Sequence, residues 1–385
     1  MAGIYIHIPF CKQRCSYCDF HFSTSFKHKE ALIKSLLQEI ESRKHLLTST
    51  INTIYFGGGT PSVLSEDELL TIVDALHKNY NIAPTVEFTL ECNPDDLTQS
   101  KLKTLKNAGI NRLSIGVQSF NNDELIFFNR AHNASEAETS IKRSQDVGFE
   151  NITIDLIFGS PLLTTAGWFN NLNKVNAFDV PHLSAYNLTV EPKTKLAHQI
   201  KIGELPKLND AKMISQFKTL IETTKTFGMV QYEVSNFGKE GFFSQHNSNY
   251  WKGEEYLGFG PSAHSYLKNQ NTSTVFEAGA KRMWNVANNM QYINAMAQKK
   301  SYFEEELIDE KTAFNEYVLT RLRTIWGIDL QEINTHFSAT INRHFQKEIR
   351  PYLNSSYLQQ LNNKIILTDE GVFIADKITS DLFIV

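Results

Sequence analysis

Three cysteines near the start of the chain have the type and spacing that most clearly predict chemistry. Cys11, Cys15 and Cys18 form a CxxxCxxC pattern, whereas the fourth cysteine, Cys92, lies far along the sequence. Thiols gathered in one loop indicate a metal site or redox chemistry rather than a disulfide framework. Three thiolates can bind three irons of a 4Fe-4S cluster, which leaves the fourth iron with an open coordination position.

The same loop allows two other interpretations. A structural zinc site could combine the three cysteines with His21, and the thiols could simply be buried. Phe10, Tyr17 and Phe20 surround the cysteines and could shield a cluster from water. Cys92 has no cysteine near it in the sequence, so we interpret it as a small buried thiol.

Polar or glycine residues follow or end each of six short apolar runs. We interpret the runs as buried parallel strands, because they are short and rich in Ile, Val, Phe and Tyr. They cover residues 4–8, 51–56, 86–90, 112–117, 152–158 and 183–188. The cysteine loop follows the first run, and the others lead to or contain Gly57–Thr60, Glu91, Gln118, Asp155 and Tyr186. Polar groups from many strand ends meet at the C-terminal rim of a barrel.

Amphipathic segments of helical length separate the runs. Ser65 with Glu68, and Ser135 with Glu138, have the spacing of a capping box that opens a helix. Gly109 and Gly148 stand where helices should end. The alternation predicts an α/β fold built as an incomplete TIM-like barrel of six β/α units. A flavodoxin-like open sheet is the alternative.

The repeat stops near residue 200. Residues 208–228 are predicted to be a helix, and residues 230–268 are predicted to be loops and short strands. From about residue 300 the pattern is helical and ends in a predicted hairpin that turns at residues 368–371. We therefore expect three domains: a barrel over 1–205, an extension over 206–298, and a small winged-helix-like domain over 299–385.

Composition and charge exclude several classes of protein. The 385 residues are 41% hydrophobic and 21% charged, which is typical of a folded protein. The net charge of −4 argues against non-specific nucleic-acid binding. No apolar run approaches the ~20 residues of a membrane span. The N-terminus lacks the pattern of a secretory signal, so a cytoplasmic location is expected.

Two motifs resemble the radical S-adenosylmethionine (SAM) superfamily. One is the CxxxCxxC loop after the first strand, and the other is Gly57-Gly58-Gly59-Thr60-Pro61 after the second. The resemblance implies that the amino and carboxylate groups of S-adenosylmethionine chelate the open iron. It also implies that an electron from the cluster can split the sulfonium into methionine and a 5′-deoxyadenosyl radical.

Further residues resemble the coproporphyrinogen-dehydrogenase branch of that superfamily. There the glutamate, glutamine and aspartate meet the nucleoside, and the arginine meets the carboxylate of the ligand. Taken individually, each of these side chains could instead form a structural salt bridge or cap. The resemblance implies the following S-adenosylmethionine contacts: Tyr5, Tyr17, Gly58, Gly59, Thr60, Glu91, Gln118, Arg130, Asp155, Tyr186 and Leu188. His7 also matches this branch, and we interpret it as a core histidine.

Within that branch the chain is most similar to HemW-type haem chaperones. Phe20 stands where the dehydrogenases have a fourth cysteine, and Tyr5 lies almost at the chain start, where they have a long N-terminal segment. The HNxxYW motif of the chaperones is present at residues 246–251. His246 could ligate haem iron while the aromatic residues cover the porphyrin. Alternatively, His246 caps a loop and Tyr250 and Trp251 pack in the core; His264 is expected to be structural.

The resemblance implies a protein that binds a 4Fe-4S cluster, S-adenosylmethionine and haem, and that delivers haem to acceptors, including membrane-associated respiratory proteins. It also implies an electron donor and a cluster-dependent homodimer. The alternatives are an oxygen-independent coproporphyrinogen III oxidase, a radical enzyme with another substrate, and a zinc-bearing nucleic-acid binder. That last alternative would use Arg343, Lys347 and Arg350 as its basic face.

Overall fold

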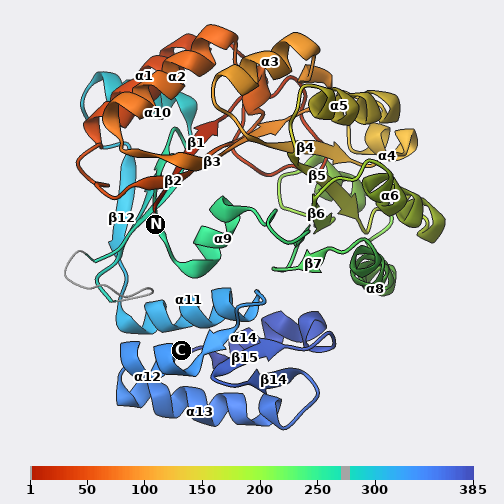
Figure 1. The fold of residues 1–385 in the computed structure, drawn as a ribbon, viewed down its shortest axis with the longest axis vertical. Helices are drawn as coiled ribbons and strands as arrows, with labels where there is room; N and C mark the ends of the chain where they lie inside the picture. Colours follow the sequence, from red (N-terminus) through yellow and green to blue (C-terminus); the bar gives the residue numbers. More distant parts are fainter. Residues whose placement is uncertain (1, 270–277) are drawn as a thin grey trace.

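The computed structural model describes residues 2–269 and 278–385 and contains one large curved sheet. Its twelve strands follow the order β12-β11-β10-β9-β1-β2-β3-β4-β5-β6-β8-β7. The seven strands from β9 through β1 to β6 are parallel, and the others are antiparallel. In the described part of the chain β12 and β7 do not pair, so the sheet is an open arc (Figure 1).

The predicted β/α repeat is confirmed over the first half of the chain. Strands β1 to β6 lie side by side in sequence order, as in a barrel, whereas a flavodoxin-like sheet would change direction at a switch point. The elements are β1 (Ala2–Ile8), α1 (Lys29–Ser42), β2 (Ile51–Gly58), η1 (Pro61–Val63), α2 (Glu66–Asn79), β3 (Ile82–Cys92), η2 (Pro94–Asp96), α3 (Gln99–Asn107), β4 (Arg112–Gln118), α4 (Asn122–Phe127), α5 (Ala134–Asp146), β5 (Asn151–Phe158), α6 (Thr165–Ala177), β6 (His182–Asn187) and α7 (Lys195–Lys201).

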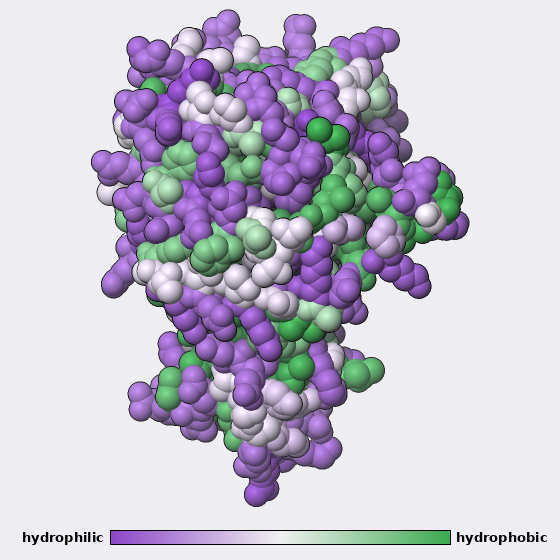
Figure 2. All heavy atoms as spheres, turned by 90° about the vertical axis from the view of Figure 1, so that its right-hand side faces the viewer, coloured by the Kyte–Doolittle hydropathy of each residue, from purple (hydrophilic) through white to green (hydrophobic). Residues whose placement is uncertain are grey.

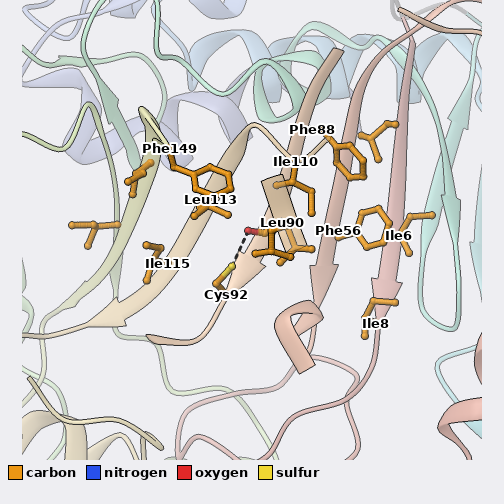
Figure 3. Close-up of a cluster of buried hydrophobic side chains, with 14 of the residues drawn as sticks. Ile6, Ile8, Phe56, Phe88, Leu90, Cys92, Ile110, Leu113, Ile115 and Phe149 are labelled. Atoms are coloured by element: carbon orange, nitrogen blue, oxygen red, sulfur yellow. Dashed lines mark hydrogen bonds between the residues drawn. The ribbon is translucent and has the colours of Figure 1, made fainter. Parts of the chain in front are cut away.

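The apolar core lies between the sheet and the helices that cover its outer face. Figure 3 shows Ile6, Phe56, Phe88 and Leu90 of β1 to β3 in one buried cluster, to which Leu113 of β4 also belongs. Because side chains alternate between the two faces of a strand, the residues next to these point to the concave face. Those residues are polar, aromatic or glycine, so one face of each strand builds the core while the other presents chemistry.

Helix ends follow the predicted signals with one exception. Ser65 and Glu68 form a capping box, and Gly109 and Gly148 adopt positive φ values of 87° and 88° after α3 and α5. The capping box predicted for Ser135 and Glu138 is wrong. Asn133 and Glu136 form it instead, because the extended Asn133 accepts the Glu136 N–H and α5 already begins at Ala134.

The middle of the chain extends the sheet on both sides and adds a helix inside the arc. The helix predicted over 208–228 is α8. The elements are α8 (Asp210–Thr226), β7 (Val230–Gln231), β8 (Asn236–Gly238), α9 (Gln245–Lys252), β9 (Glu255–Phe259), β10 (His264–Leu267), β11 (Lys281–Asn285), α10 (Asn289–Ala297) and β12 (Phe303–Leu307). Helix α9 lies on the concave side of the sheet and contains the HNxxYW motif, which the sequence placed among loops and short strands (Figure 1).

The C-terminal residues form a small lobe with its own apolar core (Figure 1). Its elements are α11 (Glu310–Leu322), β13 (Ile328–Asp329), α12 (Leu330–His336), α13 (Ala339–Leu353), β14 (Leu358–Leu361), β15 (Lys364–Leu367), η3 (Gly371–Ile374) and α14 (Ala375–Leu382). No helix in the described residues is long and apolar enough to cross a membrane.

The terminal hairpin forms earlier than predicted. Strands β14 and β15 pair around Asn362, whose φ is 55°, and not around residues 368–371. The Thr368 hydroxyl accepts the N–H of Gly371, and the chain continues as η3 and α14 instead of a second strand. Residues 368–371 therefore lead into the helical turn η3, because the Thr368 side chain satisfies the backbone N–H of Gly371 at its start.

Candidate functional site

The cysteine loop leaves the C-terminal end of β1 and is closed at its base by backbone hydrogen bonds. Cys11 N donates to Ser23 O at 3.0 Å, and Ser23 N donates to Pro9 O at 2.8 Å. Ser16 in the middle of the loop donates its N–H to Phe128 O at 3.0 Å. These bonds fix a loop that holds three free, half-buried thiols.

Two of the sulfurs receive hydrogen bonds, one from the loop after β2 and one from the loop between α4 and α5. The Thr60 hydroxyl donates to Cys11 Sγ at 3.4 Å, and Arg130 Nη1 donates to Cys15 Sγ at 3.1 Å. Burial raises the pKa of Cys11 and raises the pKa of Cys18 to about 11. Three free thiols, of which Cys11 accepts from a hydroxyl and Cys15 from a cation, fit a cluster, whose sulfurs are stabilised by hydrogen bonds of this kind.

The zinc interpretation receives no support from the position of His21. Its Nε2 lies 2.7 Å from Asn289 Oδ1, so this nitrogen is used by α10. Among residues 2–269 and 278–385, no three His, Cys, Asp or Glu side chains are placed to bind one metal ion. Cysteines that each bind a different iron of a cluster do not need to converge in that way.

Glu91 lies at the end of β3 beside the glycine motif. The Tyr55 hydroxyl donates to Glu91 Oε1 at 2.8 Å, and Gly58 N donates to Oε2 at 3.2 Å. Burial, followed by the nearby Asp155, raises the pKa of Glu91 to about 7. Gly58 has a φ of 106°, and a Cβ on it would lie 2.6 Å from the His7 ring, so only glycine fits this turn.

Gln118 on β4 and Asp155 on β5 extend this group, and Arg130, from the loop between α4 and α5, joins it by donating to Gly116 O of β4. The Ser114 hydroxyl lies 3.2 Å from Asp155 Oδ1, and burial raises the pKa of Asp155 to about 6. Gln118 has a φ of 68°, which marks a sharp turn at the strand end. Arg130 donates to Asn93 Oδ1 at 2.6 Å, while its buried Nε has no partner among the described residues. An unpartnered guanidinium N–H on the same rim as the half-buried carboxyls of Glu91 and Asp155 fits a zwitterionic nucleoside ligand.

Of the other predicted S-adenosylmethionine contacts, Tyr5 and Tyr186 have polar or exposed side chains, whereas Leu188 and Tyr17 pack in an apolar cluster. The Tyr5 hydroxyl is 3.1 Å from His7 Nδ1, and Tyr186 is 44% exposed at the end of β6. In contrast, Leu188 is buried in an apolar cluster against which Tyr17 packs. Sequence reasoning missed Tyr55, although its place in the strand alternation, on the same face as Glu91, could have identified it.

His246 is buried, and both of its ring nitrogens have partners. Thr53 Oγ1 lies 2.9 Å from Nδ1, and the Tyr250 hydroxyl lies 2.8 Å from Nε2. Burial lowers the pKa of His246 to about 3, so the ring is neutral. His264, the second histidine considered, has an exposed side chain on β10.

A carboxylate from the sheet anchors the start of α9. Glu87 of β3 accepts the backbone N–H groups of Gln245 and His246, each at 3.0 Å. A negative charge is favourable at the N-terminus of a helix, where the first N–H groups lack partners within the helix. The HNxxYW segment is therefore held on the concave face that also carries Tyr55 and Glu91.

Comparisons with known proteins agree with this arrangement. Residues 5–165 match the Radical SAM superfamily, and residues 308–374 match the HemN C-terminal domain. The chain is 32% identical to the protein named Heme chaperone HemW of Bacillus subtilis, over 98% of both chains.

This chain belongs to the HemW family of radical SAM proteins. It is also 32% identical to the Heme chaperone HemW of Lactococcus lactis, over 97% of this chain and 95% of the other. Its fold matches coproporphyrinogen III oxidase (HemN) of Escherichia coli with a TM-score of 0.84 and 20% identity, over 99% of this chain and 89% of that one. Membership of the radical SAM superfamily implies a 4Fe-4S cluster and S-adenosylmethionine.

Proposed function

We propose that this HemW-family protein is a haem chaperone that binds haem, a 4Fe-4S cluster and S-adenosylmethionine, and that transfers haem to acceptor proteins. The observation that carries the proposal is the position of α9. The HNxxYW segment lies on the concave face of β1 to β3, and His246 stacks on Tyr55, which binds Glu91. The full-length relationship to proteins named Heme chaperone HemW supports the same function.

Residues on the concave face would hold the cofactors. Cys11, Cys15 and Cys18 would bind the cluster, which when bound supplies the electron for cleavage of S-adenosylmethionine. Glu91 and Asp155 would accept hydrogen bonds from the ribose hydroxyls, because carboxyl oxygens keep acceptor capacity in either protonation state. In the present conformation Arg130 binds Cys15 Sγ and Asn93, and its free Nε would meet the ligand carboxylate.

His246 remains the predicted haem ligand, and its two hydrogen bonds, to Thr53 and to Tyr250, determine which ring nitrogen could bind iron. Iron takes the lone pair of a neutral ring nitrogen, so one of the two hydrogen bonds must be given up. The Thr53 contact at Nδ1 has the geometry of the second hydrogen bond that orients ligating histidines. Nε2 is therefore the nitrogen that would bind iron, after release of the Tyr250 hydroxyl.

The proposal includes the partners that a chaperone needs. These are an electron donor for the cluster, haem-requiring acceptors such as membrane-associated respiratory proteins, and a homodimer that depends on the cluster. It also includes a cytoplasmic location. The acidic net charge of −4 remains an argument against nucleic acid as a partner.

Anaerobic reconstitution followed by haem titration tests the function. The protein, supplied with iron and sulfide, should bind one haem per chain with a defined Soret band and then give it to a haem-free acceptor. Lack of stoichiometric haem binding would overturn the proposal. The rival function, coproporphyrinogen III oxidation, has the support of the shared HemN fold. Turnover of coproporphyrinogen III with consumption of S-adenosylmethionine would establish that rival.

A further inference from the structure

A large cleft separates the barrel from the C-terminal lobe. Its volume is about 1070 Å³, and its walls come from β6 to β8, α8 and α9 on one side and from α11, β15, η3 and α14 on the other. The barrel and the lobe have two distinct apolar clusters, and Tyr266 of β10 packs into that of the lobe, so the cleft lies where the two units join. It is large enough for a flat ligand of the size that proteins usually bury.

Exposed apolar side chains line this cleft. Tyr186 is 44% exposed, Val230 45%, Val234 37% and Ile325 43%, and all four belong to its walls. Figure 2 shows hydrophobic residues gathered on this side of the molecule, where the lobe joins the barrel. Apolar surface of this kind, concentrated in a concave site, marks a place where a ligand or partner binds.

The HNxxYW motif contributes to the cleft with three of its side chains. Asn247, Tyr250 and Trp251 line it, whereas His246 lies behind them. Tyr250 lines the cleft and also contacts His246. The edge of its ring meets the His246 ring, with 4.8 Å between centroids, and its hydroxyl lies at hydrogen-bond distance from His246 Nε2. The Tyr250 side chain therefore connects the imidazole to the wall of the cleft.

The lobe and α8 place basic groups around the apolar walls. Lys225 binds Asp369 at 2.9 Å and Arg323 binds Asp376 at 2.5 Å, and these carboxylates are 81% and 84% exposed. Ion pairs this exposed contribute little, so another carboxylate can replace Asp369 or Asp376 at small cost. An amphipathic ring with two carboxylates matches aromatic and aliphatic walls that have such cations beside them.

We propose that the cleft is the porphyrin-binding site of this chain, and that Tyr250 is a gate whose hydroxyl occupies His246 Nε2 until haem iron replaces it. This inference rests on the proposed function; it places haem in the cleft and makes Tyr250 the side chain that moves when haem binds. Haem entry breaks the Tyr250–His246 hydrogen bond and forms the iron–nitrogen bond. Thr53 keeps Nδ1 oriented throughout, and no electron or proton leaves the site.

Parallel titrations with ferric haem and with iron-free protoporphyrin IX separate the two parts of the proposal. Val234→Asp and Ile325→Glu place a charge on the apolar walls at exposed positions, and should weaken binding of both ligands tenfold or more. His246→Ala should weaken only haem and shift its Soret band. Tyr250→Phe removes the competing hydroxyl, so haem should bind about fivefold more tightly with an unchanged Soret band, the equivalent of one ordinary hydrogen bond.

The control variant is Leu307→Glu, which changes a 71% exposed apolar residue on β12, outside the cleft, and should match wild type. Haem binding that is unaffected by Val234→Asp and Ile325→Glu would overturn the cleft while leaving the chaperone function in place. Weaker haem binding and a shifted Soret band in Tyr250→Phe would make Tyr250 a ligand and overturn the gate. If His246→Ala weakened the binding of haem and of protoporphyrin IX equally, the gate would also be overturned. Wild type that binds no haem would remove the proposed function itself.

Discussion

The ring of Tyr55 stacks on the ring of His246, with centroids 5.1 Å apart and planes inclined by 24°. The hydroxyl of the same tyrosine donates to Glu91 at 2.8 Å. One side chain therefore contacts both the strand end proposed to hold the nucleoside and the histidine of the motif helix. A ligand that moves Glu91 or His246 must also act on Tyr55, so we expect the two sites to communicate.

We predict that S-adenosylmethionine and haem change each other's affinity, by about fivefold, and that Tyr55→Phe removes most of this effect. The phenylalanine keeps the stacking on His246 but loses the hydrogen bond to Glu91. Linkage requires the factor to be the same in both directions. Isothermal titration of each ligand, with and without the other, measures it.

Tyr80→Phe is the matched control for that experiment. Its hydroxyl donates to Ile40 O at 3.1 Å, on the helix side of the sheet. This variant should keep the wild-type linkage. If Tyr55→Phe retained the full effect, or if wild type showed none, the contacts of Tyr55 would not couple the two sites.

The four cysteines should separate into two classes on substitution. Alanine at position 11, 15 or 18 should abolish cluster assembly, which iron and sulfide analysis and visible absorbance would report. Cys92→Ala should assemble a full cluster, because Cys92 is buried in the core, where its thiol donates to Leu90 O (Figure 3). Its cost should be about 1 kcal/mol of stability, from lost packing. A cluster that survived loss of Cys15, or failed with Cys92→Ala, would contradict this division.

The sequence predicts the barrel well because two local rules act together there. Short apolar runs rich in Ile, Val, Phe and Tyr mark the strands, and polar residues at their ends mark the rim, so Glu91, Gln118 and Asp155 could be located without coordinates. Capping was harder to predict around α5, where Asn133 and Ser135 both have a glutamate three residues later. The competition is decided by which residue is extended before the helix, and the spacing alone does not determine that.

Features that depend on distant segments were outside the reach of sequence patterns. Helix α9 is only eight residues long, and Glu87, more than 150 residues earlier, anchors its first turn. The cleft combines Tyr186, Tyr250, Ile325 and Phe373, which no periodicity connects. The partners of His246 likewise come from β2 and α9, so its burial could be seen only after the sheet had been assembled.

Arg43 should be among the most sensitive residues for stability. It binds Glu39 at 2.9 Å in a fully buried pair and also donates to Gly258 O at 3.0 Å, which joins α1 to β9. Arg43→Met leaves the Glu39 charge without its partner, and we expect a loss of about 3–5 kcal/mol in urea unfolding. Lys281→Met breaks an exposed pair with Glu305 and should leave the midpoint unchanged. Similar midpoints for the two variants would show that the buried pair is not a major contribution.

Glu233, in the wall of the cleft, should make stability depend on pH. Burial raises its pKa from 4.5 to about 7, against hydrogen bonds from Asn236 and from the backbone of residues 234–236. The folded protein then keeps a proton that the unfolded chain has already lost, so the free energy of unfolding falls as pH rises from about 4.5 through 7. For this one group the fall between pH 5 and pH 8 should be about 2–3 kcal/mol.

Glu233→Gln isolates this contribution, because the amide is similar in shape but does not titrate in this range. Glu91 and Asp155 also have raised pKa values and act in both proteins, so they cancel in the difference between wild type and variant. In urea unfolding, the free energy of unfolding of the variant should increase relative to that of wild type between pH 5 and pH 8.

The negative charge of ionised Glu233 would also repel the carboxylates of a porphyrin in the cleft. The haem affinity of wild type should therefore fall above pH 7, and that of Glu233→Gln should not. Parallel pH profiles for the two proteins would show that Glu233 is ionised throughout, and that the cleft wall carries its charge even in the folded, ligand-free chain.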